Sequence, residues 1–163
     1  MKMSNKKFVK AIAITLTRQV TSIVIGMLLL IVLARFLGPE GQGNYTLITL
    51  LPMMLLTFLN MGMNVSNIYF VSKGEIDIHS SFKSNLFIGL ILSFISVLIG
   101  IIVVMFLSEQ FFSSISPSIL YLSLAALPFM FLTSFFQTIF QGLQNFKIFN
   151  TILVVTQITT LIL

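Results

Sequence analysis

The sequence predicts an all-α protein, a polytopic bundle of transmembrane helices. Hydrophobic residues make up 57% of the 163 residues and charged residues only 8%, and the mean hydropathy is +1.08. A soluble domain carries about 25% charged residues, whereas a bilayer accepts apolar side chains on the outer surface. The apolar runs are long and do not alternate with polar residues, which excludes strands of a membrane barrel. Backbone groups without water must be satisfied internally, so each run is expected to be helical.

Four apolar runs exceed the roughly 20 residues that cross a hydrocarbon core. They occupy residues 11–37, 44–72, 84–107 and 117–142, and a fifth run covers 149–163. We therefore expect four full spans and a truncated fifth. The fifth run ends without a polar flank, which predicts that residues 1–163 are the N-terminal part of the first transmembrane lobe of a longer protein. A natural short protein is the alternative.

The first run is expected to be an uncleaved helix rather than a signal peptide. It follows a lysine-rich start, but it is longer than the roughly 7–15 residues of a signal-peptide core, and no small-residue cleavage site follows. The sequence Gly-Pro-Glu-Gly-Gln-Gly at 38–43 predicts a helix stop and a tight loop after it.

The basic residues predict the orientation in the membrane. With a cytoplasmic N-terminus, the inner segments carry seven lysines, and the outer segments carry Arg35 with Glu40 and Glu109. The inner lysines are Lys2, Lys6, Lys7, Lys10, Lys73, Lys83 and Lys147. Positive charge on cytoplasmic loops sets topology, so we expect a multi-pass protein of the plasma (inner) membrane with its N-terminus inside.

Composition argues against several other functions. The chain has no Cys and one His, His79, so no metal site is expected. The basic residues form no stripe interleaved with aromatic residues, which argues against nucleic acid binding. Glu75 and Asp77 share a loop without a catalytic partner. We expect no enzyme, no catalytic residue and no cofactor.

Polar residues recur at helical spacing inside three of the runs, and lipid makes such residues costly. The three stripes are Thr15, Arg18 and Ser22; Thr57, Asn60, Asn64 and Asn67; and Ser134, Gln137, Gln141 and Gln144. With the N-terminus inside, all three fall in the cytoplasmic half of the membrane. One interpretation is hydrogen bonding between helices, and the other is a polar cavity open to the cytoplasm. The candidate cavity residues are Arg18, Ser22, Asn60, Asn64, Asn67, Gln137 and Gln141.

Three further features of the runs carry expectations. Arg18 either extends to the inner headgroups or pairs with an anion such as phosphate in the cavity. Pro52 and Pro128 lie inside runs and are candidates for kinks used in gating. Small residues at Gly89, Ser93, Ser96 and Gly100 predict a packing face on the third helix.

Three motifs resemble a known family. Residues 33–45 (LARFLGPEGQGNY), the stretch from Asn60 to Ser72 and residues 141–147 (QGLQNFK) are similar to the polysaccharide-exporter flippases. These belong to the multidrug/oligosaccharidyl-lipid/polysaccharide exporter superfamily. The resemblance implies two helical lobes with twelve to fourteen spans in the whole protein, and alternating access as the transport mechanism. The missing part would be the remainder of the same transporter.

The expected function is therefore a flippase that moves a lipid-linked oligosaccharide or polysaccharide precursor across the membrane. Its partners would be membrane lipids and a polyprenyl-pyrophosphate-linked sugar, with the pyrophosphate near Arg18 and the sugars near the Asn and Gln residues. An ion-coupled multidrug exporter of the MATE type is one alternative, although the four acidic residues lie in loops. A non-transporting membrane scaffold subunit is the other.

Overall fold

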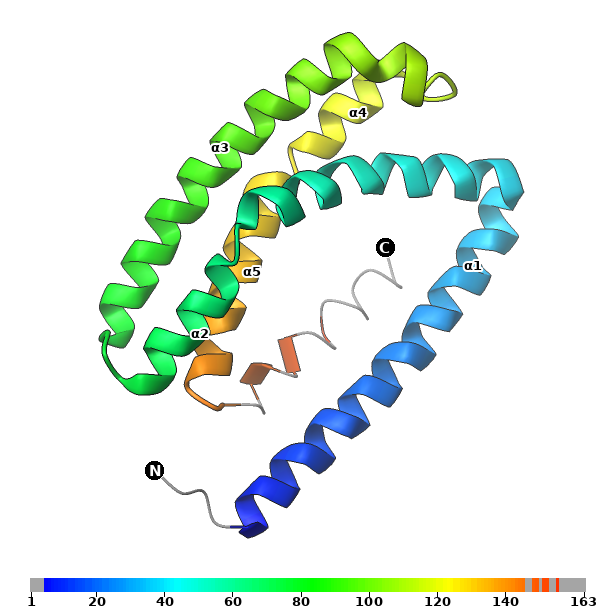
Figure 1. Cartoon of the computed structure of the whole chain (residues 1–163). Helices are drawn as coiled ribbons and strands as arrows, with labels where there is room; N and C mark the ends of the chain where they lie inside the picture. The colour runs from blue at the N-terminus through cyan, green and yellow to red at the C-terminus, as the bar shows by residue number, and fades with distance from the viewer. Residues whose placement is uncertain (1–4, 146–147, 150, 153–154, 156–163) are drawn as a thin grey trace.

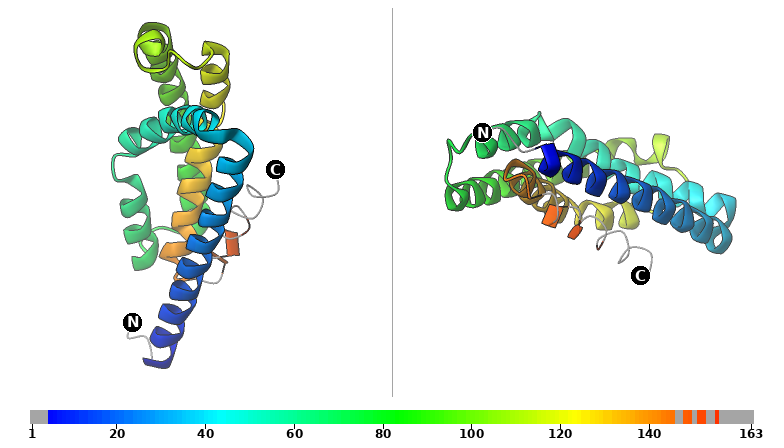
Figure 2. Two further views of the ribbon diagram at one scale, coloured as in Figure 1. Left: turned by 90° about the vertical axis from the view of Figure 1, so that its right-hand side faces the viewer. Right: turned by 90° about the horizontal axis from the view of Figure 1, so that it is seen from below.

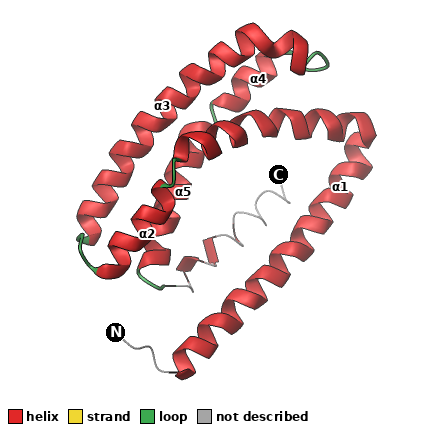
Figure 3. Ribbon diagram, viewed as in Figure 1, coloured by secondary structure: helices red, strands yellow, loops and turns green. Residues whose placement is uncertain are grey.

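The computed structural model describes residues 5–145, 148–149, 151–152 and 155, with the backbone alone for residues 5–12, 14 and 18. Its described part contains α-helices and no strand, which confirms the all-α prediction (Figures 1 and 3). The helices are α1 (Asn5–Asn60), α2 (Met63–Lys73), α3 (Ile78–Phe111), α4 (Pro117–Leu124) and α5 (Leu127–Gly142). Most of the expected fifth span, 149–163, lies outside the described residues.

Helix α1 bends at Gly38 and continues on the other side of the bend. Gly38 has φ 67° and ψ 179°, which is not helical, and it divides α1 into limbs at residues 5–37 and 39–60. The prediction of a tight loop over residues 38–43 is wrong, because the helix resumes at Pro39. Proline fits the first turn of a helix, where its missing N–H removes no intrahelical hydrogen bond.

A second break divides the run that was expected to be one span at 44–72. Met61 and Gly62 have φ angles of 46° and 77°, both left-handed, and end α1 before α2 begins. Helix α2 then ends at Gly74, another left-handed residue, whose N–H donates to the carbonyls of Phe70 and Val71. This is a common way to close a helix. The expected second span is therefore two helices with different directions.

Helix α3 presents a face of small buried residues, as predicted. Asp77 caps its N-terminus by accepting a hydrogen bond of 3.1 Å from the backbone N–H of His79. The buried positions recur every three or four residues: Ser81, Asn85, Gly89, Ser93, Ser96, Gly100 and Val104. Ser93 and Ser96 donate their hydroxyls to carbonyls of their own helix, so they meet the neighbouring helices without an unpaired hydroxyl.

The expected fourth span, 117–142, is α4 and α5 joined by a two-residue turn. The N–H groups of Ala125 and Ala126 donate to carbonyls three residues earlier, at Leu122 and Ser123. Pro128 lies in the first turn of α5 and has no N–H to give to the carbonyl four residues earlier, at Leu124. The tightened turn therefore lies next to a predicted kink residue. Pro52, the other predicted kink residue, is buried within the second limb of α1.

The helices alternate in direction (Figures 1 and 2). The start of α1, the turn from α2 to α3 and the end of α5 lie at one end, while the Gly38 bend and the loop 112–116 lie toward the other. Within the described residues, three stretches are long and apolar enough to cross a membrane: Thr15–Asn60, Ile78–Phe111 and Pro117–Gly142. The first of these includes the Gly38 bend, and so joins the first expected span to most of the second.

The buried core is small, and the outer surface is apolar. Leu120, Leu127, Phe131 and Phe135 of α4 and α5 are fully buried at 0% exposure. In contrast, many large apolar side chains of α3 point outward, such as Phe94 at 65% exposure. In water such a surface would promote association. It suits a protein whose helices are surrounded by lipid tails.

The contact between α2 and α5 requires glycine at position 142, which gives a stability prediction. A Cβ there would lie 2.8 Å from the Val71 Cβ and 3.2 Å from the Ile68 carbonyl oxygen, neither of which is a flexible chain end. We expect Gly142→Ala to destabilise the protein by about 1–3 kcal/mol, the usual cost of overpacking. Reversible unfolding in detergent measures this difference. Gly26→Ala is the matched control, since a Cβ placed there would meet nothing within 4 Å beyond its own stretch of helix. An equal effect of both changes would contradict the close contact at Gly142.

Candidate functional site

Two of the predicted polar stripes face each other across the contact between α2 and α5. The Asn64 Nδ2 on α2 donates a hydrogen bond of 2.8 Å to the Ser134 Oγ on α5. Further along both helices, Val71 of α2 and Gly142 of α5 are both buried where the two helices approach closely. We call the surface formed by Asn60, Asn64, Asn67, Ser134, Gln137 and Gln141 the polar interface. Hydrogen bonding between helices, one of the two interpretations of the stripes, therefore holds for Asn64.

Three amide atoms in the polar interface are buried without a hydrogen-bond partner in the described structure. They are the Oδ1 atoms of Asn60 and Asn64 and the Nδ2 of Asn67. The large majority of buried side-chain polar atoms are paired, and an unpaired amide costs about 1–3 kcal/mol in proteins. Two acceptors and one donor thus remain available to a bound molecule or to water.

Gln137 and Gln141 extend the interface along α5. They follow Ser134 by three and seven residues, a spacing that places all three on one face of a helix. Both side chains are half-buried. Every side chain of the polar interface is a carboxamide or a hydroxyl, so the surface can donate and accept hydrogen bonds but carries no charge.

Two members of the stripes do not belong to this interface. The exposed Thr57 hydroxyl donates to the Met53 carbonyl of its own helix, at 2.8 Å. Gln144 is exposed after the end of α5, with a left-handed φ of 56°. Helical spacing alone could not separate these residues from the others, because spacing gives the face of a helix and not what lies against it.

Two polar residues that were not predicted lie near the same end of the bundle. Asn85 is 2% exposed, and its Nδ2 donates to the Phe135 carbonyl of α5 at 3.5 Å. Ser81, one turn earlier, is 5% exposed, and its hydroxyl has no partner in the described structure. The signal was present, since both residues continue the small-residue spacing of Gly89 toward the start of α3.

The remaining candidates are not brought to the polar interface. Ser22 lies on the first limb of α1, which stands apart from α2 and α5 (Figure 1). Arg18 lies on the same limb, and its side chain is outside the described residues. Their part in a shared cavity, like the gating role of Pro52 and Pro128, stays a prediction.

The bond between Asn64 and Ser134 should be measurable as a coupling energy. We expect the double-mutant cycle of Asn64→Ala and Ser134→Ala to give about 0.6–1.7 kcal/mol, the range for hydrogen bonds between membrane helices. Unfolding of the four proteins in detergent or bicelles supplies the energies. The control cycle pairs Thr57→Ala with Ser134→Ala and should give no coupling, because the Thr57 hydroxyl bonds its own helix. Equal coupling in both cycles would contradict the contact.

Comparison with known proteins identifies a family. A search of curated proteins and a search of solved structures both find no match. The family described as "Polysaccharide biosynthesis protein" matches residues 8–163, nearly the whole chain. The match agrees with the resemblance carried by the motifs around Gly38, Asn60 and Gln141. The chain therefore belongs to the polysaccharide biosynthesis protein family, whose members are similar to O-antigen flippases.

Proposed function

We propose that this chain is part of a flippase that moves a lipid-linked oligosaccharide or polysaccharide precursor across the plasma membrane. Membership of the polysaccharide biosynthesis family supports a transport role in that process. The observation that carries the proposal is the polar interface, where buried amide atoms of three asparagines have no partner in the described structure. Polar groups at membrane depth are costly and face the bundle interior or a water-filled cavity, so amide atoms without a partner there are candidates for contact with a substrate.

In the proposed orientation the N-terminus is cytoplasmic, with four full spans and a fifth beginning near residue 149. Lys73 ends α2 and Lys83 lies near the start of α3, while Glu40 and Glu109 lie toward the other end of the helices. Basic residues favour the cytoplasmic side. The polar interface, which is near the Lys73 end, then lies in the cytoplasmic half of the membrane.

The proposed substrate has two parts that different residues would bind. Sugar hydroxyls both donate and accept, as carboxamides do, so the oligosaccharide would contact Asn60, Asn64, Asn67, Gln137 and Gln141. A pyrophosphate needs a cation, and the guanidinium of Arg18 can bind phosphate oxygens with two parallel hydrogen bonds.

Alternating access would need a second wall opposite the polar interface, so that the two enclose a cavity. The two limbs of α1 join at the bend at Gly38, so rotation there would bring Arg18 and Ser22 toward the polar interface. Pro52 and the turn before Pro128 are further points at which the helices could bend. The remainder of the transporter would close the other side of the cavity.

The chain's acidic residues argue against ion-coupled drug export as the alternative. Glu40, Glu75, Asp77 and Glu109 are all exposed and lie near helix ends or in the turn before α3. Ion coupling in a membrane usually uses an acidic residue at membrane depth.

Replacement of Asn67 tests the sugar-binding role most cleanly. Leucine is close in size to asparagine, and the described structure gives the Asn67 Nδ2 no partner within the protein. We expect Asn67→Leu in the full-length protein to lower the rate of lipid-linked oligosaccharide translocation about tenfold, the effect of roughly 1.4 kcal/mol on a barrier. Translocation is measured in proteoliposomes through the accessibility of the sugar to an added lectin or enzyme. Arg18→Gln should reduce translocation at least as much.

Thr57→Val is the control, because its hydroxyl is exposed and bonds only its own helix. It should leave translocation and expression unchanged. Normal translocation by both Asn67→Leu and Arg18→Gln would refute the assigned roles. Drug efflux that is lost in the same variants, with no sugar-lipid transport by the parent protein, would instead identify a multidrug exporter.

A further inference from the structure

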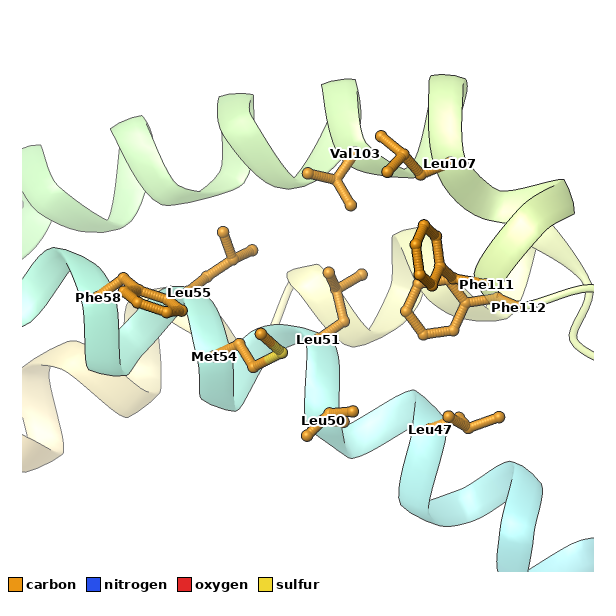
Figure 4. A pocket seen from close by; sticks show the side chains of 10 residues that line it. All are labelled: Leu47, Leu50, Leu51, Met54, Leu55, Phe58, Val103, Leu107, Phe111 and Phe112. Atoms are coloured by element: carbon orange, nitrogen blue, oxygen red, sulfur yellow. The ribbon is translucent and has the colours of Figure 1, made fainter.

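A groove separate from the polar interface runs between the second limb of α1 and the outer part of α3 (Figure 4). We call it the α1–α3 groove. All ten side chains that line it are apolar, and they are Leu47, Leu50, Leu51, Met54, Leu55, Phe58, Val103, Leu107, Phe111 and Phe112. Nothing in the lining can hydrogen-bond a polar ligand strongly, so its occupant must be a hydrocarbon.

The groove has a buried floor and an exposed rim. Leu51, Leu55 and Phe112 are at most 9% exposed, whereas Phe58 and Phe111 are 71% and 64% exposed. Figure 4 shows Phe58 at one end and Phe111 with Phe112 at the other. A molecule in the surrounding bilayer can therefore enter from the side without unfolding any helix.

The dimensions of the groove fit a single extended chain. Its volume is about 300 Å³, and its length from Leu47 to Phe58 is about 16 Å at 1.5 Å per residue. Packed hydrocarbon groups lie about 4–4.5 Å apart, so a long, narrow groove of this volume suits one extended hydrocarbon chain. A whole helix is about 10 Å wide and would not fit inside it.

A polar pair lies just beyond the Phe111 end of the groove. Ser114 in the loop after α3 donates its hydroxyl to the Asn44 Oδ1, at 2.8 Å, and both groups are accessible. Asn44 precedes Leu47 by three residues and so lies on the same face of α1. The length of the groove is about half of the roughly 30 Å hydrocarbon core. The groove thus has a polar end followed by an apolar lining, the same order as the headgroup and acyl chain of a phospholipid.

We propose that the α1–α3 groove binds one acyl chain of a membrane phospholipid from the leaflet at the Gly38 end, with its glycerol and headgroup beside Asn44 and Ser114. The polyprenyl chain of a transported substrate fits less well. Asn60 is the only member of the polar interface that shares helix α1 with the groove, and it follows Leu51 by nine residues. That separation is about two and a half turns, which places the two on opposite sides of the helix. The phospholipid site does not depend on the proposed function.

Photo-crosslinking of the full protein in nanodiscs tests this site. The probe is a phosphatidylethanolamine with a diazirine at the middle of one acyl chain, and mass spectrometry maps the labelled peptides. We expect labelling to concentrate on residues 47–58 and 103–112. Val103→Trp, which fills the groove, should lower that labelling about tenfold, the effect of roughly 1.4 kcal/mol, because the chain then loses its close packing contacts with the groove. Ile102→Trp is the control, since Ile102 is the neighbouring residue, exposed and outside the groove.

The remaining outcomes decide among occupants. Excess unlabelled polyprenyl phosphate should not displace the probe, and displacement would assign the groove to the substrate's chain instead. Uniform labelling of all outward residues of α3, or equal loss in both tryptophan variants, would show bulk lipid and no site. If Val103→Trp does not fold, Leu107→Phe, with a smaller added volume, should show the same selective loss.

Discussion

Close approach of α3 to its neighbours is the constraint on which the rest of the structure depends. Apolar side chains gain nothing by leaving lipid for protein, so membrane helices associate through tight packing and hydrogen bonds. A Cβ at Gly89 would lie 3.1 Å from a Leu132 side chain, and one at Gly100 would lie 2.5 Å from the Leu124 side chain. Without a side chain at these positions, α4 and α5 can lie directly on α3, and Asn85 can reach the Phe135 carbonyl.

The polar interface follows from this packing together with the break at Met61 and Gly62. α5 is held against α3, which fixes the direction of Ser134, Gln137 and Gln141. The left-handed pair then turns α2 so that Asn64 meets Ser134 and Val71 meets Gly142. A continuous helix through residue 62 would carry the asparagines in another direction. The same break leaves Asn60 and Asn67 with buried amide atoms that no described group pairs.

Much of this could be predicted from the sequence because lipid imposes simple rules. Long apolar runs predict the helices, the spacing of Gly89, Ser93, Ser96 and Gly100 predicts the packing face of α3, and the family motifs predict the family. Polar spacing also identified Asn60, Asn64 and Asn67. That Asn64 meets Ser134 could not be predicted, because spacing gives the face of one helix and not the helix opposite it.

The errors also have physical causes. Gly38 and Pro39 were expected to open a loop, yet a single glycine with φ 67° is enough to bend the chain before proline starts the next helical limb. The break after Asn60 depends on a left-handed methionine, a conformation that its residue type does not announce. Ser81 was missed because it precedes the expected start of the span at residue 84, while α3 begins at Ile78, and Asn85 was missed because it is only the second residue of that expected span.

Labelling of single cysteines in a lipid bilayer tests the central claim most directly, namely that polar groups face a shared interior while apolar faces meet lipid. The chain has no native cysteine, so each introduced thiol reports alone. Cysteines at Asn60, Asn64 and Asn67 should react with a small hydrophilic maleimide added on the Lys73 side. Cysteines at Leu90, Phe94 and Ile102 on the outward face of α3 should remain unreactive. Rapid reaction at the α3 positions, with none at the asparagines, would contradict the account.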